Sequence, residues 1–167
     1  MSTMTKLLAN TTLQSVTLGL LDDELPERGL FGTARLFYFL DKELPSIPSR
    51  DPLLSSKEQV SNLFGRYLKN KPLVLQSPIS PIRHLEQGIW ELKTLDVRVF
   101  GWFANKDTMI LDAGCDVKLL KAGNLAYSGF INQTNYIRKS LGFSSADYIQ
   151  GTTPNDILTK FLVLPRR

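Results

Sequence analysis

Basic side chains that could hold a phosphate group lie in the middle of this 167-residue chain. Arg98 stands inside the apolar run 97–104, and Lys118 and Lys121 follow the next apolar run. A cation held on a rigid β-sheet, with further cations on the segment beyond it, is suited to bind a phosphate backbone. These residues therefore predict an anion-binding surface whose geometry depends on the strands that carry them.

Closely spaced apolar segments supply those strands. We expect strands at residues 88–94, 97–104 and 108–113, separated by short polar steps. A parallel connection needs about a dozen residues or more, so segments this close in sequence can pair only antiparallel. They predict a compact meander. Its aromatic residues Trp90 and Phe103 are expected in the core.

Two longer helices are expected beside the meander. The first covers residues 55–70 and begins with Ser55 and Glu58, which match the capping-box pattern. Apolar residues then recur at helical spacing, which predicts one buried face. The second helix covers residues 124–141, and Gly142 is well placed to end it.

The remaining segments have mixed patterns. Residues 3–21 could form a helix, and the β-forming residues at 33–40 predict a strand, with a short helix as the alternative. Residues 73–87 contain prolines and predict an irregular connection. Pro154 opens a last short helix, with Thr153 as its cap.

Composition limits the class of protein. An apolar fraction of 43% and a charged fraction of 22% are typical of a globular chain, here of single-domain length. A net charge of +4 permits an anionic partner without requiring one. The single cysteine, Cys115, rules out an intrachain disulfide and favours a reducing cytoplasm. We expect a cytoplasmic protein without a membrane helix, because no apolar run reaches roughly 20 residues, and without a metal site, because one His and one Cys lack ligand spacing.

The sequence around the first two strands resembles a known family. The matching residues are Leu85, Gly88, Ile89, Trp90, Glu91, Leu92, Arg98, Val99, Phe100 and Phe103. This pattern is similar to that of the RelE/ParE superfamily of small bacterial toxins, and closest to the HigB-like, phage-derived group. The resemblance covers residues 33–121 in outline and 85–103 in detail. It implies an α+β fold in which helices pack on a curved antiparallel sheet, extended here by helical segments at both ends, the second at 122–167.

The resemblance also implies a chemistry. RelE-like members cut messenger RNA on the ribosome, ParE-like members inhibit gyrase, and a cognate antitoxin neutralises both. The cleavage needs no metal: a base activates the ribose 2′-hydroxyl, a cation stabilises the charged phosphorane, and an acid protonates the leaving oxygen. The implied function is an mRNA endoribonuclease toxin without a cofactor, whose partners are an antitoxin, mRNA and, as in RelE-like members, the ribosome.

Individual residues take candidate roles from this resemblance. Arg98 matches the sheet arginine of the motif and is the candidate for phosphate stabilisation. His84 is the acid/base candidate, because it alone titrates near neutral pH when unperturbed. Lys93 matches a strand position that is often basic in RelE-like enzymes. The candidate RNA-binding residues are Arg83, Lys118, Lys121 and Trp102, the last by stacking on a base.

These residues also have structural interpretations. Arg98 could pair with a carboxylate such as Glu91 or Asp112, and His84 could be a surface histidine. Glu91 stands where RelE-like sheets often carry a second lysine, and the segment after residue 121 is longer than such toxins usually need. The alternative function is therefore a non-enzymatic interaction or inhibitor protein of phage or plasmid origin on the same scaffold.

Overall fold

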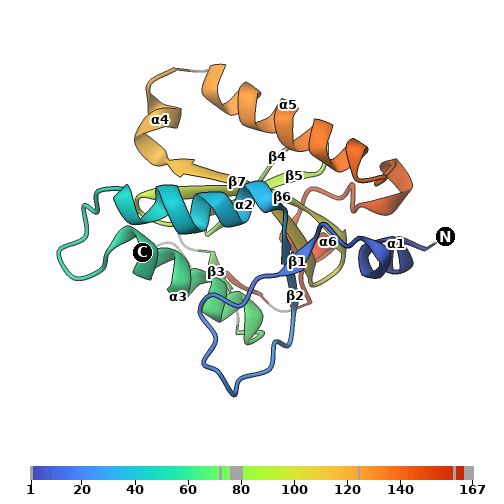
Figure 1. Ribbon diagram of the computed structural model, residues 1–167, viewed down its shortest axis with the longest axis horizontal. Helices are drawn as coiled ribbons and strands as arrows, with labels where there is room; N and C mark the ends of the chain where they lie inside the picture. The colour runs from blue at the N-terminus through green and yellow to red at the C-terminus, as the bar shows by residue number, and fades with distance from the viewer. Residues whose placement is uncertain (1, 72, 76–80, 124, 160, 164–167) are drawn as a thin grey trace.

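A six-stranded sheet, ordered β1-β2-β7-β6-β5-β4, runs through the computed structural model, with helices on both faces (Figure 1). The structure describes residues 2–71, 73–75, 81–123, 125–159 and 161–163. The strands of the sheet are β1 Gln14–Ser15, β2 Gly29–Gly32, β4 Ile82–Glu86, β5 Ile89–Lys93, β6 Val97–Asn105 and β7 Thr108–Asp116. A second sheet contains β3 Leu73–Leu75 and β8 Phe161–Val163, which run parallel. The fold is thus α+β, as expected.

The helices flank this sheet and connect its strands. They are α1 Thr3–Ala9, α2 Ala34–Tyr38, η1 Phe39–Glu43, η2 Leu44–Ser46, α3 Ser56–Leu68, α4 Val117–Lys121, α5 Leu125–Ser140, η3 Ser145–Asp147 and α6 Pro154–Ile157. Among the described residues, no helix has the length and apolar character that would be needed to span a membrane.

The predicted meander is confirmed. β5 pairs antiparallel with β6, and β6 pairs antiparallel with β7. The register places Lys93 opposite Arg98 and Arg98 opposite Cys115. β4 adds an antiparallel edge in which Arg83 lies opposite Glu91. Opposite residues share a face of a sheet, and so do residues two apart in one strand, so these five side chains belong to the same face.

Two expectations about the N-terminal half are wrong. Residues 33–40 form helix α2 and the start of η1 instead of a strand, because the Thr33 hydroxyl accepts a hydrogen bond from the Leu36 backbone and caps the helix. The short helix was the alternative. The sheet is also mixed instead of purely antiparallel, since β2 pairs parallel with β7. A long stretch of chain separates these two strands, which leaves room for the crossover that parallel pairing requires.

Two other segments differ from expectation in extent. Helix α1 ends at Ala9, so most of the segment 3–21 is not helical. The segment 73–87 contains β3 and β4 instead of only irregular chain, while residues 76–80 lie outside the described part. Prolines in this segment did not prevent strand formation, because Pro81 directly precedes β4 and an edge strand tolerates proline at its beginning.

The expected helix signals are confirmed. Ser55 and Glu58 form a complete capping box at the start of α3. Helix α5 occupies the predicted segment, and Gly142 just beyond it has a φ of +89°, a value that favours glycine. Thr153 caps α6, reciprocally with Asp156.

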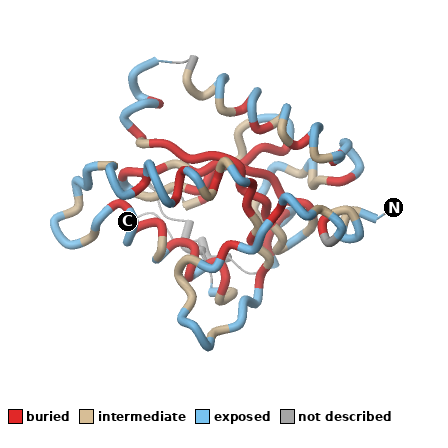
Figure 2. The backbone as a smooth tube through the Cα atoms, in the orientation of Figure 1, coloured by how far each residue is buried: buried red, intermediate tan, exposed pale blue. Residues whose placement is uncertain are grey.

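Helices cover both faces of the sheet, so its central strands are buried (Figure 2). On one face, residues of α2, η1 and α3 pack against Trp90, Val99 and Phe103. On the other face, α1 and α5 pack against Ile89 and Trp102. Trp90 and Phe103 are core residues, as predicted, with exposed fractions of 1% and 0%.

Replacing Trp90 with Ala should therefore lower the free energy of unfolding by about 3–5 kcal/mol, because a large buried ring leaves a cavity. Chemical denaturation measures this change. Tyr38, which is 60% exposed on α2, provides the control, and Tyr38→Ala should cost less than about 1 kcal/mol. A loss that small for Trp90→Ala would mean that the indole does not belong to the core.

Candidate anion-binding site

Cations gather on the sheet face that α5 covers. Lys93 and Arg98 are directly opposite each other across β5 and β6, and Arg83 lies on the neighbouring strand β4. Burial lowers the pKa of Lys93; nearby Glu91 raises it, while Arg98 and Arg83 add to the decrease. The sequence-predicted residues Arg83, Lys93 and Arg98 are thus close enough to act on one another electrostatically.

A buried carboxylate lies beside these cations. Glu91 is fully buried, and its Oε1 accepts a hydrogen bond from Arg83 Nε at 2.8 Å. The Tyr127 hydroxyl of α5 donates to the other oxygen, Oε2, at 3.0 Å. The Arg83 guanidinium also lies 5.5 Å from the centre of the Tyr127 ring, in a cation–π arrangement. Burial raises the pKa of the Tyr127 phenol and Glu91 raises it further, so the hydroxyl stays a donor.

Arg98 has a different environment from Arg83. Its Nη1 donates to the backbone carbonyls of Thr94 and Val97. Its Nε is buried and has no acceptor among the described residues. The expected structural pairings of Arg98 do not occur, because Glu91 pairs with Arg83, and Asp112 with Arg35 at 3.2 Å. In the described part of the chain, neither Lys93 nor Arg98 forms an ion pair.

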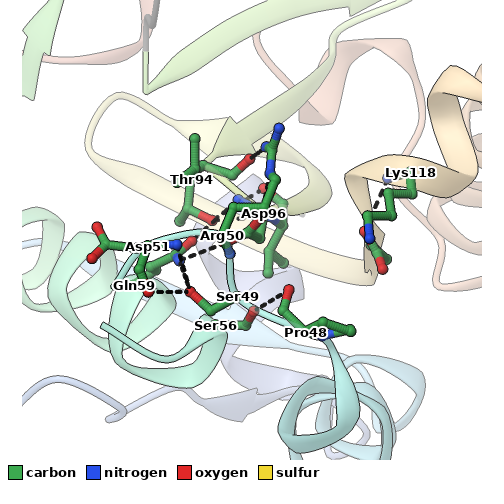
Figure 3. A network of polar contacts seen from close by, with 12 residues as sticks. Pro48, Ser49, Arg50, Asp51, Ser56, Gln59, Thr94, Asp96 and Lys118 are labelled. Atoms are coloured by element: carbon green, nitrogen blue, oxygen red, sulfur yellow. Dashed lines mark hydrogen bonds and ion pairs between the residues drawn. The ribbon is translucent and has the colours of Figure 1, made fainter. Parts of the chain in front are cut away.

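A polar network fixes the turn whose carbonyls hold Arg98 (Figure 3). The buried carboxylate of Asp96 accepts hydrogen bonds from Arg50 Nε at 2.8 Å and from Gln59 Nε2 of α3 at 2.7 Å. Burial acts to raise the pKa of Asp96, but the hydrogen bonds from Arg50 and Gln59 lower it overall. The β5–β6 turn is therefore anchored to α3 and to the loop before it, which gives Arg98 a rigid support.

Two predicted site residues lie elsewhere. His84 faces the opposite side of the sheet from Arg98, because its register partner is Trp90, and their rings are 5.2 Å apart. Burial lowers the pKa of His84. Trp102 has no exposed surface, so it is not available to stack on an RNA base. The structure brings neither residue together with Lys93 and Arg98.

Lys118 and Lys121 lie on the short helix α4, and both are exposed. Figure 3 shows Lys118 on that helix, away from the Asp96 network. The helix starts where Asp116 Oδ1 accepts a hydrogen bond from the Lys118 backbone at 2.9 Å. These lysines are accessible to an anionic partner, but no described contact joins them to Arg98.

Sequence reasoning missed Tyr127. Its partner Glu91 is 36 positions away, on a different element, so no local pattern links them.

Cys115 lies opposite Arg98 in the strand register. Burial raises the pKa of its thiol to about 12, although Arg98 acts to lower it, so the thiol stays neutral. Within the described ranges, no group of three or more His, Cys, Asp or Glu residues could hold a metal ion.

Comparisons of the chain with protein-family profiles, with curated proteins and with solved structures find no match. The resemblance to RelE/ParE toxins therefore rests on the sequence, in outline at 33–121 and in detail at 85–103. The geometry is independent of this resemblance. Lys93 and Arg98, which form no ion pair among the described residues, lie opposite each other beside a buried carboxylate that accepts a hydrogen bond from a tyrosine hydroxyl.

Replacing Tyr127 with Phe should lower the free energy of unfolding by about 1.5–3 kcal/mol, because the buried Glu91 carboxylate loses a donor while the ring packing is kept. Urea denaturation tests this. Tyr136→Phe is the matched control on the same helix, since Tyr136 is 70% exposed, and should change stability by less than about 0.5 kcal/mol. Equal, small effects of both substitutions would show that the Tyr127–Glu91 hydrogen bond is not formed in solution.

Proposed function

We propose that this protein is a metal-free endoribonuclease toxin on a RelE-like, HigB-like scaffold, with mRNA as its substrate. The observation that supports the proposal is the position of Lys93 directly across from Arg98 on neighbouring strands. They are opposite each other on a buried sheet, and neither forms an ion pair within the described residues. Two such cations can bind the same phosphodiester. A cognate antitoxin and, as a further partner, the ribosome belong to the same proposal.

The chemistry divides between these two residues. Arg98 stabilises the negative charge that develops on the phosphorane, because its planar guanidinium carries several N–H donors and the anchored turn holds it in place. Lys93 is the base: its neutral amine takes the proton of the ribose 2′-hydroxyl as the 2′-oxygen bonds to phosphorus, and the 5′-oxygen released when the P–O5′ bond breaks takes its proton from water. Burial favours this role because it lowers the pKa of the Lys93 ammonium. Glu91 and Tyr127 hold Arg83 beside them. His84, on the other face, has no part in this proposal.

Arg98→Ala is the decisive substitution. RNA cleavage and growth inhibition should fall roughly 100-fold or more, as when one oxyanion-stabilising group is removed from an active site. Induced expression with growth curves and RNA-end mapping measures the effect, and Lys93→Ala should lose activity as well. Lys57→Ala, an exposed residue of α3, is the control and should behave as wild type.

Folding must be followed in the same variants. Arg98→Ala should retain a thermal midpoint close to that of wild type, because a partly exposed strand arginine that forms no ion pair with any described residue contributes little to stability. The proposal fails if the wild-type protein never cleaves RNA while Arg98→Ala loses much of its stability. Arg98 would then serve the structure alone.

The second candidate is a non-enzymatic interaction or inhibitor protein. The observation that favours it is the exposure of large apolar side chains on the helices after the sheet: Leu119 on α4 is 53% exposed and Tyr136 on α5 is 70% exposed. Exposed apolar and aromatic residues are common at protein interfaces. A neighbouring reading frame that encodes a helix-turn-helix antitoxin would favour the toxin over this alternative.

A further inference from the structure

A cavity of about 460 Å³ lies at the C-terminal end of α5, next to η3. Its lining includes Arg138 and Lys139 from the helix, Ser144 and Ser145 from the start of η3, and Tyr148. A volume of this size falls within the range of small-molecule sites in proteins, roughly 300–1,000 Å³. The cavity thus combines two basic side chains with two hydroxyl groups.

Arg138 is the unusual member of this lining. Its exposed fraction is 1%, yet its Nε and Nη1 have no acceptor among the described residues. Among the described residues, only Nη2 donates a hydrogen bond, to the Asn135 side-chain oxygen at 2.7 Å. The guanidinium also lies 3.5 Å from the centre of the Tyr148 ring. Asn135 and Tyr148 therefore hold the group in one position while leaving most of its donors unused, although a buried charge without a counter-ion is costly.

The described residues that line the cavity include no acidic side chain, and the nearby Asp147 is committed to other partners. Asp147 of η3 forms an ion pair with Lys6 at 2.6 Å, and its Oδ2 also accepts hydrogen bonds from the backbone and hydroxyl of Ser144. The ion pair with Lys6 and these hydrogen bonds lower the pKa of Asp147, which keeps it ionised but committed to them. In the part of the chain that the structure describes, Arg138 and Lys139 consequently have no ion-pair partner.

The cavity is separate from the Lys93–Arg98 pair. Asn135 bonds to Gln87 in the β4–β5 turn. Tyr148 packs on Gly88 of that turn so closely that a Cβ there would meet its ring at 2.7 Å. Lys93 is the last residue of β5, five residues after Gly88, and an extended chain of that length spans about 17 Å.

We propose that this cavity binds the phosphate group of a nucleotide-sized phosphate monoester. A guanidinium donates to tetrahedral oxyanions through parallel N–H groups. Two cations without an ion-pair partner in the described part of the chain, with the Ser145 hydroxyl in the same lining, favour a doubly charged ligand over a singly charged carboxylate. The cavity is also larger than a free phosphate ion requires. The inference does not depend on the ribonuclease proposal, because it uses none of the same residues.

Thermal unfolding of the full chain tests it, with inorganic phosphate, adenosine monophosphate or sodium chloride at matched ionic strength. Both phosphates should raise the thermal midpoint saturably, since a ligand that binds only the folded state stabilises it. Adenosine monophosphate should bind more tightly than inorganic phosphate. Arg138→Met should weaken both responses at least tenfold, whereas Lys57→Met, which removes one charge from α3, should leave them unchanged.

Two further measurements keep the test decisive if Arg138→Met fails to fold. Lys139→Met alters only an exposed side chain and should weaken the response severalfold. In the wild-type protein, the NMR resonance of the Arg138 Nε–H group should shift on phosphate addition. The proposal is overturned if phosphate acts no differently from chloride, if Arg138 variants respond fully, or if a single-stranded RNA oligomer binds through Arg138 while the monophosphate does not.

Discussion

The burial of the β5–β6–β7 meander on both faces is the constraint from which the rest of the structure follows. Helices α2 and α3 cover one side and α1 and α5 the other, so the interior of this sheet has almost no contact with water (Figure 2). An ionised carboxylate placed there loses several kcal/mol of hydration, roughly, unless a cation and hydrogen bonds replace the water. The acidic residues of the meander that are buried are Glu91, Asp96 and Asp112. Each has an arginine partner: Arg83, Arg50 and Arg35, respectively.

These pairs determine how distant elements dock. Arg35, in α2, forms an ion pair with Asp112 of β7. The Thr33 hydroxyl that caps this helix also donates to Asp112, at 2.9 Å. Burial raises the pKa of Asp112, while Arg35 and Thr33 counteract the increase. Arg50 ties the loop before α3 to the turn at Asp96 in the same way. One buried carboxylate thus fixes the start of α2, directly after the parallel strand β2, to β7.

The parts of the fold that could be predicted from sequence are those encoded locally. The meander follows from short separations, and α3 from its own capping box, because both depend on residues within a few positions of one another. The parts that could not be predicted depend on contacts between distant segments. The cap that Thr33 forms with the Leu36 backbone is a local signal of a helix, but its hydrogen bond to the Asp112 carboxylate joins residues 79 positions apart. The position of Lys93 opposite Arg98 could be anticipated, because a short turn joins their strands. The contacts of Tyr127 with Glu91 and of Arg138 with Tyr148 could not, because each joins two different elements.

The buried cations that do not pair with these carboxylates indicate what kind of partner the molecule could bind. Arg98 and Arg138 each have a buried Nε without an acceptor in the described part of the chain. Stability alone would favour a carboxylate partner beside each of them, or an apolar side chain in place of each. Both lie on the α5 side of the sheet, near opposite ends of β5. A cation that costs stability but is held in a fixed position is ready to bind an anion without further ordering. This arrangement supports an anionic partner at each position, a phosphodiester beside Lys93 and a phosphate monoester beside Lys139.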